Sequence, residues 1–115
     1  MVVAIMFAVM FSSCESETIQ PEKAAVITPG TVVKFSESIL PIFSKYSCTA
    51  CHPTAKNLDF TTANAYTSVM KVVNTTTPAS STFYITLSST HNGKDLTATE
   101  KAYILEWIKE GALNN

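Results

Sequence analysis

The sequence predicts a small all-α domain, because apolar residues recur at helical spacing in two places and the one weakly alternating stretch has no partner strand. The first helical pattern runs directly into residue 48 and consists of Phe35, Ile39, Ile42, Phe43 and Tyr46. The second lies between residues 97 and 111. A chain of 115 residues has room for one small domain, so we expect these helices to share a single core.

The first predicted helix contains a proline, which limits where the helix can begin. Pro41 has no amide proton and is tolerated in the first turn of a helix, where that proton would have no partner within the helix. We therefore expect the Ser38 side chain to cap this helix and Pro41 to fall in its first turn.

The middle of the chain gives weaker signals. Residues 53–60 are expected to form a loop, and residues 62–73 a helix whose apolar stripe includes Met70 and places it in the core. The tract 74–81 contains Pro78 and ends this helix. Residues 83–87 are expected to form an extended or a short helical piece.

The last helix has the clearest boundaries. Thr97 and Glu100 have the spacing of a capping box, and Gly111 supplies the stop. A broad apolar arc lies between them, made of Tyr103, Ile104, Leu105, Trp107 and Ile108.

Residues 1–13 are predicted to be a lipoprotein signal peptide. The first 11 residues are all apolar, which is shorter than the roughly 20 residues of a membrane span and typical of a signal-peptide core. Two serines then precede Cys14, a pattern similar to a lipobox, whose cysteine is lipidated. No basic residue comes before Lys23, so we expect the true start to lie upstream. A plain apolar leader with an incidental Cys14 is the alternative.

Residues 14–30 lack a sustained period and end in a Pro-Gly pair, so we expect a flexible tether between the lipid anchor and a domain at 31–115. These features predict an extracytoplasmic protein, anchored at the periplasmic or outer-membrane surface of a bacterium. The formal net charge of -1 and the absence of arginine argue against a nucleic-acid partner.

The motif Cys48-Thr49-Ala50-Cys51-His52 is CxxCH, the attachment signature of c-type haem. Two thiols on one helical turn can each form a thioether to a haem vinyl group, and the adjacent His52 can then bind the iron as proximal ligand. Three other interpretations exist. A thioredoxin-like dithiol lacks the preceding βαβ pattern, a zinc site lacks a second ligand pair, and a disulfide leaves His52 without a role.

The second axial position of the iron has three candidate occupants: His91, Met70 or water. His91 lies in a loop marked by Asn92-Gly93, directly before the last helix, and we favour it as distal ligand. Two imidazoles would give a lower potential than a His and Met pair. We expect the haem pocket to be lined by Phe43, Leu58, Phe60 and Trp107, with Trp107 also packing against the first helix.

Three segments together resemble the small cytochrome c domain of planctomycete-type and Bacteroidetes lipoproteins: ILPIF at 39–43, CTACH at 48–52 and LTATEKAYILEWIKEGA at 96–112. The resemblance covers about residues 33–114 and implies a cytochrome c-like fold wrapped around covalent haem c. That family usually carries a Met-Pro distal ligand before the last helix, and here His91 takes that place.

The resemblance implies single-electron transfer with redox partner proteins, and it leaves the oligomeric state open. The alternative function is that of a five-coordinate haem protein that reduces peroxide or senses a gas. The lack of arginine weakens the peroxidase version, because no distal guanidinium is available. A haemless interaction module is the remaining possibility.

Overall fold

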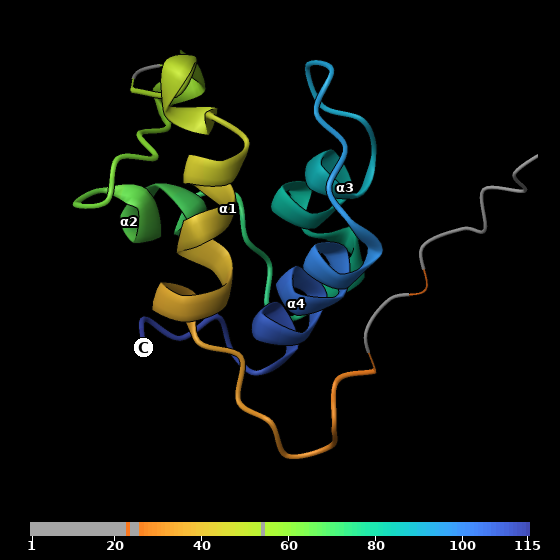
Figure 1. The fold of residues 1–115 in the computed structure, drawn as a ribbon. Helices are drawn as coiled ribbons and strands as arrows, with labels where there is room; N and C mark the ends of the chain where they lie inside the picture. Colours follow the sequence, from red (N-terminus) through yellow and green to blue (C-terminus); the bar gives the residue numbers. More distant parts are fainter. Residues whose placement is uncertain (1–22, 24–25, 54) are drawn as a thin grey trace, which may run out of the picture.

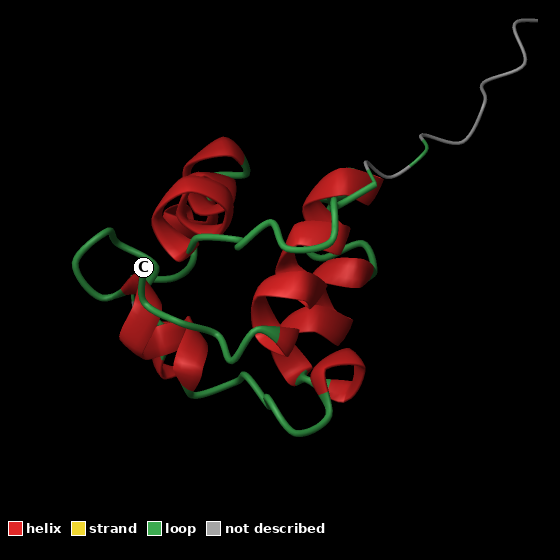
Figure 2. Ribbon diagram, turned by 90° about the horizontal axis from the view of Figure 1, so that it is seen from below, coloured by secondary structure: helices red, strands yellow, loops and turns green. Residues whose placement is uncertain are grey.

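The computed structural model describes residues 23, 26–53 and 55–115, and these residues form helices and loops without a strand, so the all-α prediction is confirmed (Figures 1 and 2). In chain order the helical segments are η1 (Phe35–Ile39), α1 (Leu40–Lys45), η2 (Cys48–Ala50), η3 (Ala55–Asn57), α2 (Ala65–Met70), η4 (Pro78–Ser80), α3 (Thr82–Ser88) and α4 (Ala98–Lys109). Figure 1 shows α1 and α2 on one side of the molecule and α3 and α4 on the other.

The predicted signal peptide at 1–13 and the lipidation site Cys14 lie outside the described residues, as does most of the predicted tether. No helix in the described ranges is both long enough and apolar enough to cross a membrane.

Pro41 sets the geometry of the first helix. Because Pro41 has no N–H, the carbonyl of Glu37 cannot receive an α-helical hydrogen bond from it. The first helical segment therefore begins with a wider π turn, η1, in which the N–H of Leu40 donates to the carbonyl of Phe35. The expectation that Ser38 caps this helix was wrong: the helical segment begins at Phe35, where the wide turn tolerates the missing hydrogen bond.

The middle helix, α2, is shorter than the expected helix at 62–73, and a different face of it is buried. It is preceded by a turn in which Asp59 accepts hydrogen bonds from the Thr61 N–H at 2.9 Å and the Asn64 amide at 2.7 Å. Ala65, Ser68 and Val69 face the core, whereas Met70 is 37% exposed, so its placement in the core was wrong. Residues 83–87 belong to α3, which confirms the helical alternative for that segment.

The predicted boundaries of α4 are confirmed. The Thr97 side chain accepts from the Glu100 N–H while the Glu100 carboxylate accepts from the Thr97 N–H, which is a complete capping box. Gly111 follows the helix with a φ of +98°, the left-handed conformation in which helices commonly end. The buried face of α4 consists of Ile104, Trp107 and Ile108.

Trp107 lies at the centre of the core. Its ring centre is 5.4 Å from that of Phe35 in η1, which confirms the expected packing against the first helix. Its indole N–H donates to the carbonyl of Leu113 at 2.9 Å, so the residues after α4 fold back over the helix. The side chain of Asn115 accepts from the Phe35 N–H at 2.9 Å. These bonds fix the C-terminal tail against the start of η1.

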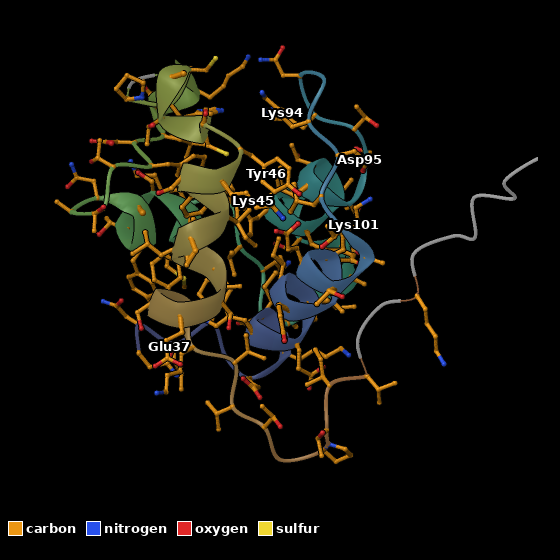
Figure 3. All side chains as sticks on the ribbon, viewed as in Figure 1. Glu37, Lys45, Tyr46, Lys94, Asp95 and Lys101 are labelled. Atoms are coloured by element: carbon orange, nitrogen blue, oxygen red, sulfur yellow. The ribbon has the colours of Figure 1, made fainter. Side chains whose placement is uncertain are left out.

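Glu100 also joins α4 to the end of α1. Lys45 and the Tyr46 hydroxyl each donate to its carboxylate at 2.7 Å, on the side of α1 that faces α4 (Figure 3). Burial by itself would raise the pKa of Glu100, but hydrogen bonds from Lys45, Tyr46 and Thr97 outweigh it and lower the pKa to about 2. The ionised carboxylate is therefore the stable form in the folded protein.

Replacing Glu100 by Gln is expected to lower the free energy of unfolding at pH 7 by about 1–2 kcal/mol. Because the folded-state pKa lies below the ordinary value of 4.5, wild type keeps this stabilisation above that pH and loses it as the pH falls towards about 2. Urea unfolding at several pH values measures the difference, which should shrink across this window.

The control is Glu106→Gln, which removes a surface pair with Lys109 on the same helix. It should change stability by less than about 0.5 kcal/mol at any pH. A Glu100→Gln effect that is equally large at pH 7 and near pH 2 would contradict the assignment.

Candidate cofactor site

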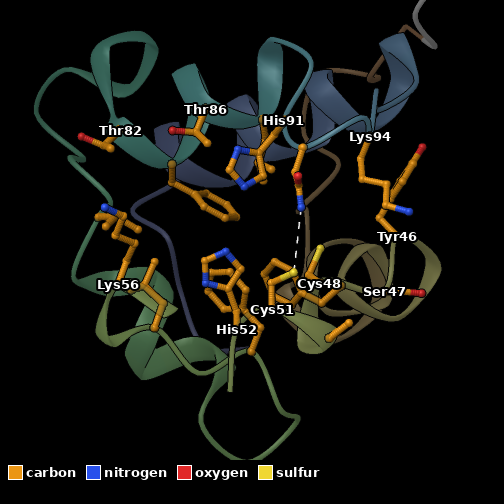
Figure 4. Close-up of a pocket in the computed structure, with 18 residues that line it drawn as sticks. Tyr46, Ser47, Cys48, Cys51, His52, Lys56, Thr82, Thr86, His91 and Lys94 are labelled. Carbon is orange, nitrogen blue, oxygen red and sulfur yellow. Dashed lines mark hydrogen bonds between the residues drawn. The ribbon is translucent and has the colours of Figure 1, made fainter. Parts of the chain in front are cut away.

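A cavity of about 710 Å³ separates two walls of the domain, within the range of about 300–1,000 Å³ usual for cofactor sites. One wall is formed by the end of α1, the CxxCH turn and the segment through η3 to Phe60. The other is formed by α3 and the loop after it (Figure 4). Seven of the eight predicted pocket residues line the cavity: Phe43, Cys48, Cys51, His52, Leu58, Phe60 and His91.

The CxxCH motif begins at a sharp turn. Ser47 has a φ of +53°, which reverses the chain after α1 and starts the 3-10 turn η2. The N–H groups of Cys51 and His52 both donate to the carbonyl of Cys48, at 3.2 and 2.9 Å. Both thiols are free, Cys48 partly buried and Cys51 exposed. Burial raises the pKa of the Cys48 thiol, and the nearby charge of Lys94 offsets part of this rise.

The imidazole of His52 is held in one tautomer. Its Nδ1 lies 3.0 Å from the carbonyl oxygen of Ala55, and since a carbonyl can only accept, Nδ1 carries the proton. The lone pair of Nε2 is therefore free to bind a metal, and the hydrogen bond orients the ring as it does for metal-bound histidines. The ring also contacts Phe60, with centroids 4.9 Å apart.

His91 is positioned by a tight turn. Its N–H and C=O each form a 2.9 Å hydrogen bond with Lys94. The two residues between them, Asn92 and Gly93, both have positive φ angles, +50° and +74°. This is the pattern of a type I′ turn, which strongly favours Asn-Gly. The Asn92 side chain also donates weakly to Cys51 Sγ at 3.9 Å, which connects the loop to the motif (Figure 4).

His52 and His91 lie on opposite walls and point towards each other across the cavity (Figure 4). Their ring centroids are 6.3 Å apart and the ring planes differ by 26°. Metal–nitrogen bonds of about 2.0–2.1 Å, with each nitrogen about 1.2 Å from its ring centre, place two coaxial imidazole centroids about 6.4–6.6 Å apart, just above the observed 6.3 Å. The spacing of the two histidines therefore fits two axial ligands on one metal ion.

Two histidines supply only two of the ligands that an octahedral ion needs. The described residues contain no group of three or more His, Cys, Asp and Glu side chains that could hold a metal ion. The remaining donors would come from a macrocycle such as haem, which also suits two free thiols beside His52. The residues present thus fit a covalently attached haem.

The cavity has an aromatic wall. Phe43 and Phe60 stack with centroids 4.6 Å apart, and Phe83 meets Phe43 edge to face at 6.2 Å. Leu58 and Leu87 add further apolar side chains to the lining of this wall and of the facing helix α3.

The structure places Trp107 outside this lining, in the core against Phe35. Sequence reasoning instead missed Phe83 and Leu87 of α3, which line the cavity. Their i, i+4 spacing was the available signal, and it has meaning only once residues 83–87 are taken as a helix.

No family model matches the chain, and no curated protein or solved structure matches it either.

Proposed function

We propose that this protein is a monohaem c-type cytochrome that transfers single electrons. The observation that carries the proposal is the pair of imidazoles facing each other at 6.3 Å, beside the two free thiols of one CxxCH turn. Bound haem would supply an iron that changes its charge by one electron. The chain would supply its axial ligands, its two covalent anchors and its apolar surroundings.

The residues of the site have separable roles in this proposal. Cys48 and Cys51 would attach the macrocycle, and His52 and His91 would bind the iron from its two faces. The hydrogen bond from His52 to Ala55 orients the ring and keeps Nε2 available for the iron. With both imidazoles bound, the iron would have no open position for peroxide or a gas, which favours electron transfer over the five-coordinate alternative.

The protein is expected to carry haem that stays on the polypeptide in acidified organic solvent when it is expressed with a c-type maturation system. The ferric protein should be low-spin. His91→Ala should convert it to a high-spin spectrum, because one axial ligand is lost while the covalent anchors remain. Absorption spectra of the two proteins make this measurement.

Met70→Ala is the matched control, because Met70 does not line the cavity. It should leave the spectrum unchanged. A high-spin wild-type spectrum that His91→Ala does not alter would support the five-coordinate function, and haem released by the solvent would contradict covalent attachment.

We also propose that the domain works outside the cytoplasm, tethered by lipid on Cys14. The support is the sequence pattern before Cys14, an apolar run followed by Ser12 and Ser13. Cys14→Ser should move the protein from the membrane fraction to the soluble fraction, as measured by fractionation and immunoblotting. Retention of the variant in membranes would refute lipid anchoring.

A further inference from the structure

We infer that Lys56 is the counter-ion for the carboxylates of the macrocycle, an inference that rests on the proposed function. Lys56 lines the cavity at its exposed rim and has no hydrogen-bond or ion-pair partner among the described residues. Four other lysines each pair with a carboxylate: Lys34, Lys45, Lys101 and Lys109. A cation left without a partner at a cavity rim is suited to an anionic group of the occupant.

The thioether anchors decide which edge of the macrocycle meets Lys56. Haem carries its two vinyl groups along one edge and its two propionates along the opposite edge. Attachment to Cys48 and Cys51 directs the vinyl edge towards those thiols. Figure 4 shows His52 between the two cysteines on one side and Lys56 on the other, so the propionate edge is directed to the Lys56 end. Thr82 of α3 lies at the same end of the opposite wall.

The backbone at Lys56 has an unfavourable conformation. Lys56 and Asn57 both have φ of +58°, a left-handed conformation that costs a non-glycine residue about 1 kcal/mol or more. Such outliers concentrate at binding sites, where the surroundings impose them. Here the Asn57 carbonyl accepts from Lys71 at 3.0 Å, which helps to fix the turn.

The charges around the cavity favour an anionic occupant. The residues that line it include no Asp or Glu. Its titratable side chains besides Lys56 are Tyr46, Cys48, Cys51, His52, His91 and Lys94. Lys94 also has no acidic partner in the part of the chain that the structure describes, but it lies at the cysteine end, away from Lys56 (Figure 4). The chain therefore offers a matched pair of cavity lysines at opposite ends.

The test is the pH dependence of the reduction potential of the haem-loaded protein, measured by spectroelectrochemistry. Lys56→Asn removes the charge and suits the left-handed backbone. It should move the inflection that reports propionate ionisation upward by up to about one pH unit, because an opposite charge nearby lowers a carboxyl pKa and solvent at the exposed rim screens part of this effect. Lys94→Asn should leave the inflection in place, and Lys56→Arg should retain the wild-type profile.

Two outcomes overturn the inference. If Lys56→Asn and Lys94→Asn leave the inflection equally unchanged, Lys56 is not the counter-ion while the cytochrome assignment stands. If the chain takes up no covalent haem, the proposed function and this inference both fail. Should Lys56→Asn not accumulate, an unchanged inflection in Lys56→Gln would overturn the inference in the same way.

Discussion

A single carboxylate, that of Glu100, joins the last helix to the end of α1. Glu100 lies in the first turn of α4, shortly after the loop that carries His91, and it accepts hydrogen bonds from Lys45 and Tyr46, directly before the CxxCH turn. The same carboxylate closes the capping box of α4. One group thus both starts the last helix and anchors it to the end of α1, next to the CxxCH turn. The buried core beneath, centred on Trp107, makes that connection rigid.

The two histidines that would bind the iron are positioned by different means. His52 is oriented by a hydrogen bond to Ala55 and by contact with the stacked rings of Phe60 and Phe43, so its wall is packed. His91 is exposed and depends on a two-residue turn with a weak link to Cys51. His52 is therefore prearranged by packing, and His91 by local backbone geometry. In the proposed site, this asymmetry would make His91 the more adjustable ligand of the two.

Much of the fold could be predicted because its signals are local. The capping box at Thr97 and Glu100 and the stop at Gly111 act within one turn, and they appear where expected. Ser38 and Met70 were misplaced because two local turns have alternatives that the apolar spacing does not distinguish: a π turn before Pro41 and a turn at Asp59 that delays the start of α2. The cavity residues Phe83 and Leu87, and the placement of Trp107 in the core, depend on how helices pack, which residue spacing alone does not specify.

In the proposed site, two nearly parallel imidazoles would bind one haem iron. Low-temperature electron paramagnetic resonance of the ferric protein tests it most directly, because the low-spin signal depends on the angle between the ligand planes. The ring planes of His52 and His91 differ by 26°. We therefore predict a rhombic low-spin spectrum of the type given by near-parallel imidazoles. A high-spin spectrum, or the highly anisotropic signal of perpendicular ligands, would contradict the account.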